Sequence, residues 1–122
     1  MIGLGIDLCE IARIERTLEK SDAFLLRFYG EEERAYLASR GRVRAESAAG
    51  MFAAKEAFLK AVGTGLNGAP LSDVTVTHDE GGCPRYALNG KALALLEKCG
   101  ASHALLSITH DAGVAAAVCV IE

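Results

Sequence analysis

Residues 45–65 read AESAAGMFAAKEAFLKAVGTG, and this segment carries more structural information than any other in the 122-residue chain. It contains no proline, and apolar side chains cover most of its circumference when it is drawn as a helix. Gly63 and Gly65 follow where the periodic pattern ends, and a helix commonly stops at such residues. We therefore expect a helix from about Ala45 to Val62 that lies in the core of the protein.

Within the stretch 51–62, this apolar surface is interrupted by three charged side chains, namely Lys55, Glu56 and Lys60. At about 100° per residue they fall on one arc, which predicts a single polar sector that opens on a cleft. Each charge needs a partner, because a buried charge without one is very costly. Glu56 and Lys60 are i,i+4 neighbours, and a simple salt bridge between them is the structural alternative to a binding site.

The chain opens on a strict alternation that predicts a strand. One face carries Ile2, Leu4, Ile6 and Leu8. The opposite face carries Gly3, Gly5 and Asp7. Because glycine lets a backbone, a helix or a ligand approach closely, Asp7 is expected to project from a cleared surface.

Asp7 and Glu56 are the candidate metal ligands of this sequence. Two carboxylates with open coordination positions suit a hard divalent cation such as Mg²⁺, which also binds phosphate oxygens. Together with Lys60 they predict a phosphate site. The structural alternative for Asp7 is a cap on the helix that follows it. A dinucleotide-binding fingerprint is a poor match, since no third glycine precedes a helix.

The rest of the chain predicts an α+β fold in a single domain that spans residues 1–122. Breaks near Ser21 and Gly30 divide the region between Glu10 and Arg40 into two or three short helices. The second half predicts two hairpins around a helix, with strands near 74–76, 86–88, 105–110 and 114–121 and the helix over 91–99. The expected architecture is an antiparallel sheet packed against the long central helix.

The final strand, 114–121, is rich in Ala and Val, which is typical of burial on both faces. In so small a chain, the second face of a sheet is often covered by another subunit. We therefore expect a homo-oligomer.

The composition is that of an ordinary globular protein, with 51% hydrophobic and 24% charged residues. A net charge of −3 argues against nucleic-acid binding. Ten of the 13 Lys and Arg residues nevertheless lie in residues 1–60, where an anionic ligand or acidic partner would dock most easily. Four cysteines without metal-ligand spacing favour a reduced, cytoplasmic setting, and no segment is long and apolar enough for a membrane span.

Several weaker signals have both a functional and a structural interpretation. Arg40, Arg42 and Arg44 cluster before the long helix, either to receive a terminal phosphate or as ordinary exposed arginines. His110 lies beside a turn, where a histidine is usually structural. The run 63–65, Gly-Thr-Gly, either offers backbone N–H groups to a phosphate or a flat base, or only ends the helix.

Two segments resemble the signature motifs of the holo-acyl-carrier-protein synthase family, the small bacterial 4'-phosphopantetheinyl transferases. The first is Gly3-Leu4-Gly5-Ile6-Asp7 followed by Arg13, and the second is the run FAAKEAFLKAVGTG at 52–65. Phe24, Arg27 and Glu33 fit the intervening motif, and Ser107-Ile108-Thr109-His110 fits the late strand. The resemblance covers nearly the whole chain.

The resemblance implies a reaction of fatty acid biosynthesis. The 4'-phosphopantetheine arm of coenzyme A would pass to a serine of apo acyl carrier protein, with release of adenosine 3',5'-bisphosphate. Asp7 and Glu56 would hold Mg²⁺ on the diphosphate, and Lys60 would contact a phosphate oxygen. The base that deprotonates the serine would be Glu56 or a metal-bound water.

The resemblance also implies an assembly and its binding residues. Coenzyme A would be bound by Lys60, Gly63, Thr64, Gly65 and Arg44. The enzyme would form a homotrimer with the active site between subunits, and Ser107 and His110 would complete the site of a neighbour. Arg13 on the first helix would meet the acidic carrier protein.

Met51 is a departure from the family pattern, because family members commonly carry Arg at this position. Arg44 or Arg42 is the expected substitute for that phosphate contact. Two competing functions are a non-catalytic trimeric binding module and a metal-dependent phosphohydrolase. The intact set of Asp7, Glu56 and Lys60 argues against the first, and the lack of further acidic ligands argues against the second.

Overall fold

Helix α4 (Arg44–Ala61) is the central element, and the other elements lie on its two sides. In the computed structural model, which describes all 122 residues, α4 is buried over most of its length, and Ala53, Phe58 and Leu59 are fully enclosed. The helix expected over 45–62 is thus confirmed to within one residue at each end.

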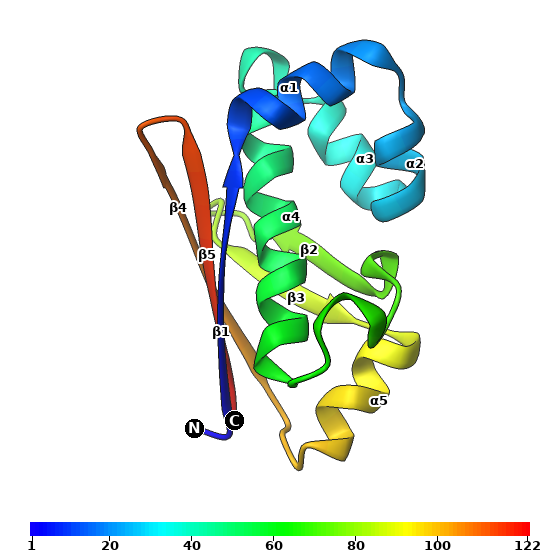
Figure 1. Ribbon diagram of the computed structural model, residues 1–122, viewed down its shortest axis with the longest axis vertical. Helices are drawn as coiled ribbons and strands as arrows, with labels where there is room; N and C mark the ends of the chain where they lie inside the picture. The colour runs from blue at the N-terminus through cyan, green and yellow to red at the C-terminus, as the bar shows by residue number, and fades with distance from the viewer.

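A three-stranded antiparallel sheet covers one side of α4 (Figure 1). Its strands are β1 (Gly3–Glu10), β4 (Ala104–Asp111) and β5 (Val114–Ile121), in the order β1-β5-β4. The N–H of Ile2 donates to the carbonyl of Ile121 at 2.8 Å, so the two ends of the chain lie side by side. Within one chain β5 is buried on the face toward α4 and only half-buried on the other.

Three short helices follow β1, namely α1 (Ile11–Lys20), α2 (Ala23–Phe28) and α3 (Glu31–Ala38). The breaks fall where expected, near Ser21 and at Gly30. Glu33 accepts a hydrogen bond from the N–H of Gly30 at 2.9 Å, which satisfies a donor at the start of α3.

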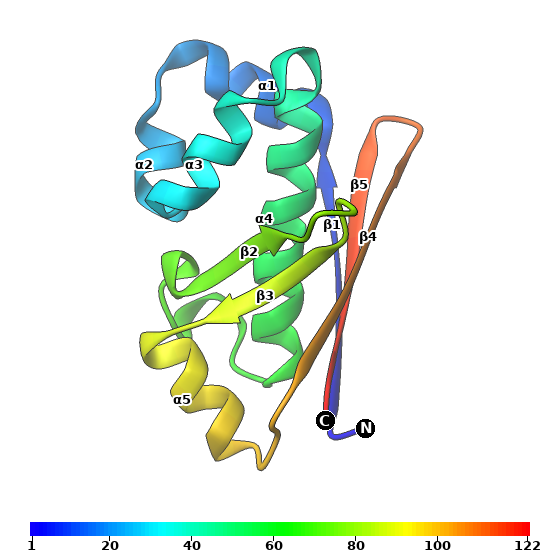
Figure 2. The same ribbon diagram turned by 180° about the vertical axis from the view of Figure 1, so that it is seen from behind.

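The β2–β3 hairpin and α5 lie on the side of α4 away from the sheet (Figure 2). Strands β2 (Val74–His78) and β3 (Pro84–Leu88) pair antiparallel, and α5 (Gly90–Lys98) follows. Asp79 closes the hairpin turn, since its Oδ1 accepts the N–H groups of Gly81 and Cys83 at 2.9 Å each. Short 3₁₀ turns at Gly41–Val43, Gly65–Asn67 and Leu71–Asp73 complete the chain.

The expected α+β class is confirmed, with an antiparallel sheet packed on the long helix and the short helices N-terminal to it. No helix combines the length and the apolarity that crossing a bilayer requires.

Candidate functional site

The site forms where β1 crosses α4, and glycine makes the crossing possible. A Cβ added to Gly3 would collide with the carbonyl oxygen of Ala61, and one added to Gly5 would collide with that of Ala57. The strand therefore lies directly on the helix backbone, as the bare face of the strand predicts. This close approach brings Asp7, which shares the glycine face, up to the side chains of α4.

Lys60 pairs with Asp7 across this crossing. Its Nζ donates to Oδ1 of Asp7 at 2.7 Å and to the carbonyl of Ile6 at 3.1 Å. The hydrogen bond to Asp7 raises the pKa of Lys60. No salt bridge joins Lys60 to Glu56, so the i,i+4 pair considered as an alternative does not form. Asp7 is not a helix cap either, because α1 begins after Glu10 without a side-chain cap.

Glu56 is the second carboxylate of the site and is half-buried on α4. Burial raises its pKa, and the negative charge of Asp7 raises it further, while the cations of Lys60 and Arg13 act in the opposite direction. The strand and the helix therefore hold two acids within electrostatic reach of each other.

Lys55 does not share this polar sector, and the expectation that three charges line one arc is wrong. Its side chain is fully buried, and Nζ donates to Oε1 of Glu33 at 2.8 Å. The carbonyls of Leu71 and Val74 accept its other two protons at 3.0 and 2.8 Å. An angular offset of about 100° from Glu56 is enough to turn Lys55 toward α3 and β2 rather than toward β1. Its role is structural.

The donor set fits Mg²⁺ when phosphate is also present. No group of three or more His, Cys, Asp or Glu side chains is placed to hold a metal ion. Mg²⁺ is usually bound through one or two carboxylates, with water and substrate phosphates filling the other positions. A cation would also relieve the repulsion between Asp7 and Glu56 that contributes to the raised pKa of Glu56.

The Gly63-Thr64-Gly65 run follows α4 at the same end as Lys60. Gly63 has φ of +85°, and its N–H donates to the carbonyl of Lys60 at 3.0 Å. The N–H of Thr64 donates to the carbonyl of Leu59 at 3.1 Å, which completes a Schellman cap. The helix-stop interpretation is thus confirmed for the first two residues. The N–H of Gly65 makes no backbone hydrogen bond, and binding of coenzyme A by this run stays a prediction.

Arg44 and His110 lie toward the other end of α4, and Ser107 lies on the outer face of the sheet. Arg44 begins α4, and the 18 residues of the helix span about 27 Å. His110 faces α4, where its Nε2 lies 2.7 Å from Oε1 of Glu46. Ser107 is three residues earlier on the same strand and therefore lies on the opposite face of the sheet. A single chain does not bring these residues to Asp7 and Glu56.

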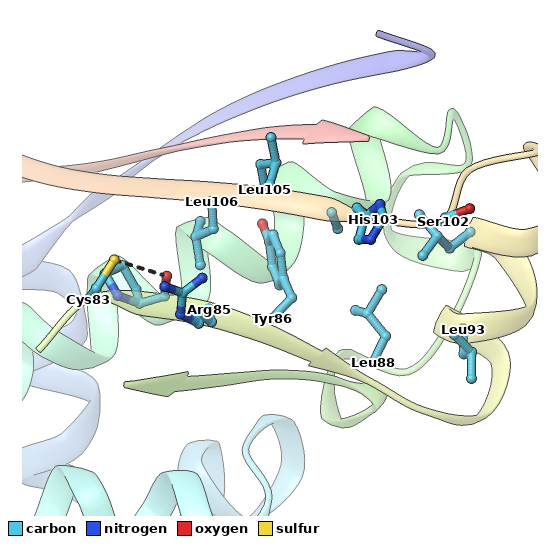
Figure 3. Close-up of a pocket in the computed structure, with 12 residues that line it drawn as sticks. Cys83, Arg85, Tyr86, Leu88, Leu93, Ser102, His103, Leu105 and Leu106 are labelled. Atoms are coloured by element: carbon cyan, nitrogen blue, oxygen red, sulfur yellow. Dashed lines mark hydrogen bonds between the residues drawn. The ribbon is translucent and has the colours of Figure 1, made fainter. Parts of the chain in front are cut away.

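Two cavities lie away from Asp7, Glu56 and Lys60. The larger, of about 420 Å³, opens between β3, β4 and α5, and most of the residues that line it are hydrophobic (Figure 3). It contains none of the predicted site residues. The second, of about 270 Å³, holds Met51 and His110 together with Tyr36, Arg40 and His78. No spacing in the sequence links Tyr36 to His78, because only the tertiary fold brings α3 beside β2.

Comparison with known proteins identifies the family. The model of the 4'-phosphopantetheinyl transferase superfamily matches residues 3–119. A holo-[acyl-carrier-protein] synthase of Treponema denticola is 45% identical over 100% of this chain and 98% of its own length. One from Myxococcus xanthus is also 45% identical, over 98% of this chain and 94% of its own.

Solved structures that resemble this chain are also holo-[acyl-carrier-protein] synthases. The holo-[acyl-carrier-protein] synthase of Neisseria meningitidis superposes with a TM-score of 0.89 at 34% identity, over 100% of this chain and 98% of that one. The Helicobacter pylori synthase in complex with coenzyme A gives 0.84 at 30% identity, over 98% and 99%. The chain belongs to the 4'-phosphopantetheinyl transferase superfamily.

Proposed function

We propose that this protein is a holo-acyl-carrier-protein synthase, which transfers the 4'-phosphopantetheine group of coenzyme A to a serine of apo acyl carrier protein. Relatives that match it over essentially its full length are named holo-[acyl-carrier-protein] synthase. A similar synthase has been crystallised with coenzyme A. The observation that carries the proposal is the ion pair of Asp7 and Lys60 beside the half-buried Glu56.

The reaction exchanges one phosphorus–oxygen bond for another. The serine oxygen bonds to the phosphorus that bears the pantetheine arm, and the bond from that phosphorus to adenosine 3',5'-bisphosphate breaks. Lys60 has three N–H donors, of which Asp7 and the carbonyl of Ile6 use two, so one remains for a phosphate oxygen. A fixed cation at that position stabilises charge that develops during the transfer.

The serine must also lose its proton. The raised pKa of Glu56 makes its carboxylate a stronger base than an ordinary glutamate, which suits it to accept that proton. Asp7 and Glu56 are also the residues that would hold Mg²⁺, which when bound neutralises negative charge on the diphosphate.

We further propose that three copies assemble through the outer face of the sheet. On that face Leu4, Ile6 and Leu8 are each more than half exposed. Exposed apolar surface of this kind is typical of a protein interface. Assembly would also join the two separated ends of the site, with His110 of one copy serving Asp7 and Glu56 of the next. A cytoplasmic location and a single catalytic domain over residues 1–122 complete the proposal.

The carrier protein would dock beside the site through the first helix. Arg13 lies exposed on α1, and its cation is close enough to lower the pKa of Glu56. An acidic carrier bound at Arg13 would therefore present its serine next to the two carboxylates.

Mass spectrometry tests the reaction directly. The protein is incubated with coenzyme A, Mg²⁺ and apo carrier protein, and the carrier is expected to gain the mass of phosphopantetheine. Asp7→Asn and Glu56→Gln should each slow transfer at least about a hundredfold, since each removes a charge that the transition state needs. Glu10→Gln, an acid at the exposed end of the same strand, is the matched control and should transfer at the wild-type rate. No gain of mass with any of several bacterial carriers would favour the binding module instead.

A further inference from the structure

The turn of α4 that carries Glu56 is anchored on the side of the helix away from β1. The first anchor is the side chain of Lys55, which is fully buried. Its Nζ donates to Oε1 of Glu33 at 2.8 Å and to the carbonyls of Leu71 and Val74 at 3.0 and 2.8 Å. The acceptors belong to α3, to a 3₁₀ turn and to β2. Because a hydrogen bond is directional, three converging bonds oppose rotation of the helix as well as sliding.

The carboxylate that meets Lys55 is itself held in place. Glu33 is only 1% exposed, and its Oε1 also accepts the N–H of Gly30 at 2.9 Å. Its Oε2 accepts the N–H of Val76 at 2.9 Å, so the carboxylate joins the start of α3 to β2. Stability alone does not require an ion pair here, since apolar residues of similar volume often replace a buried ion pair without loss. What the pair adds to the packing is a fixed direction.

Tyr86 supplies a second anchor from β3. Its hydroxyl donates to the carbonyl of Ala54 at 2.5 Å, and its ring centre lies 5.7 Å from that of Phe58. Figure 3 shows the ring extending from β3 with the hydroxyl at its far end. Ala54 lies just before Lys55 and Glu56 in the helix, so both anchors act within one helical turn of the Glu56 carboxylate.

The position of Glu56 depends strongly on the rotation of α4 about its axis. Side-chain groups on the surface of an α-helix lie about 5–6 Å from the axis, so a rotation of about 10° moves them by about 1 Å. Asp7 does not follow that rotation, because it lies on β1. A displacement of about 1 Å between reacting groups can slow an enzyme about a hundredfold. Anchors that touch neither carboxylate therefore act on the distance between the two.

We propose that Glu33, Lys55 and Tyr86 are positioning residues. They fix the rotation of α4 and thereby hold Glu56 at a set distance from Asp7. The glycine face of β1 sets how closely strand and helix approach, but it has no side chain that fixes the rotation. This inference rests on the proposed function, which gives the two carboxylates their task.

Tyr86→Phe and Tyr29→Phe form a matched pair of variants. Each removes one hydroxyl that donates to a carbonyl of α4, that of Ala54 in the first case and that of Ala48, at 2.7 Å, in the second. Ala48 precedes Glu56 by about 12 Å along the helix, so the loss of its bond should not move the carboxylate. Both variants keep their aromatic ring and should fold, but only Tyr86→Phe should alter the site.

The affinity for Mn²⁺ in the presence of adenosine 3',5'-bisphosphate reports the carboxylate geometry without a carrier protein. Mn²⁺ prefers oxygen ligands as Mg²⁺ does, and its binding is measured by electron paramagnetic resonance. Tyr86→Phe should weaken Mn²⁺ binding about tenfold, which is typical when a residue that orients a metal ligand is lost. Tyr29→Phe should stay within about twofold of wild type.

The transfer assay gives a second measurement on the same variants. The kcat of Tyr86→Phe, per folded protein, should fall about tenfold, because Glu56 is displaced from the reacting groups. The KM for coenzyme A should stay within about twofold, since Lys60 keeps its bonds to β1. Glu33→Gln retains an acceptor for Lys55 and should transfer faster than Glu33→Ala, which removes it. If neither Glu33 variant folds, the two tyrosine variants alone test the proposal.

Equal Mn²⁺ affinities and equal kcat values in the two tyrosine variants would overturn the proposal. A failure of the proposed function has a different signature, namely that the wild-type protein transfers nothing to any carrier. In that case the positioning role is tested by the Mn²⁺ affinities, which require no transfer.

Discussion

Neighbouring charges on α4 have opposite roles. Lys55 and Glu56 are adjacent in the chain, yet Lys55 is fully enclosed and Glu56 is only half-buried. Burial lowers the pKa of Lys55, while the Glu33 carboxylate opposes that change. All three of its protons are bonded, so Lys55 ties α3, α4 and β2 together rather than facing substrate.

The fold holds the Glu56 carboxylate at a cost in stability. Its pKa in the folded state is raised above the ordinary value of 4.5, so the fold destabilises the ionised carboxylate. That cost is absent below pH 4.5 and is fully present above the raised pKa. Glu56→Gln should therefore be more stable than wild type at pH 7, by less than about 1 kcal/mol because solvent screens the site. Thermal melts at pH 4 and pH 7 check this, and an equal difference at both would contradict it.

Addition of Mg²⁺ should reverse that order of stability. A ligand that binds only the folded state raises its stability by RT ln(1 + [L]/Kd), or about 1.4 kcal/mol at ten times Kd. The wild-type melting temperature should rise with added Mg²⁺, most strongly when adenosine 3',5'-bisphosphate is also present. The melting temperature of Glu56→Gln should change little on addition of Mg²⁺. Identical rises in the two proteins would place the metal elsewhere.

Among the contacts between secondary-structure elements, the one between β1 and α4 sets the geometry of the candidate site. Gly5 lies against the backbone of α4 at Ala57, and a backbone cannot move aside as a flexible side chain can. This contact determines how far Asp7 stands from Lys60. The strand is therefore as much a part of the site as the helix.

Gly5→Ala tests that contact. The added methyl group must push β1 and α4 apart. We therefore expect the free energy of unfolding to fall by about 1–3 kcal/mol and the phosphopantetheine transfer to slow. Gly81→Ala, where an added Cβ would meet only Oδ1 of Asp79 at an ordinary 3.5 Å, is the control. The control should stay within about 0.5 kcal/mol of wild type. The free energy of unfolding of both variants is measured by calorimetry. A Gly5→Ala variant as stable as wild type would contradict the prediction and show that β1 and α4 can move apart at no cost.

At the scale of the whole molecule, the sheet is covered on one face only. The outer face of β1 exposes a row of large apolar residues, and the neighbouring strand β5 continues it with half-buried Val118 and Val120. Within one chain nothing covers this surface. In the proposed assembly, a second copy of the chain covers this surface.

Leu4→Lys places a charge in the middle of that face. A buried unpaired charge would make association unfavourable, so the variant should run as a single chain in sedimentation equilibrium, whereas the proposed assembly predicts a three-chain mass for wild type. Its circular dichroism should match wild type, because Leu4 is already exposed within the chain. Leu93→Lys on α5 is the control and should keep the wild-type mass. A monomeric wild-type protein would exclude the proposed assembly.

Local patterns in the sequence determined the helix over 45–62, the alternating first strand and the two hairpins. Each depends on periodicity and on glycine, and these act between residues that are close in the chain. The pairing of Asp7 with Lys60 and the burial of Lys55 against Glu33 were decided by the tertiary structure alone. Each of these depends on side chains that meet from distant elements, and the rotation of about 100° between consecutive helix residues is enough to send adjacent charges to different partners.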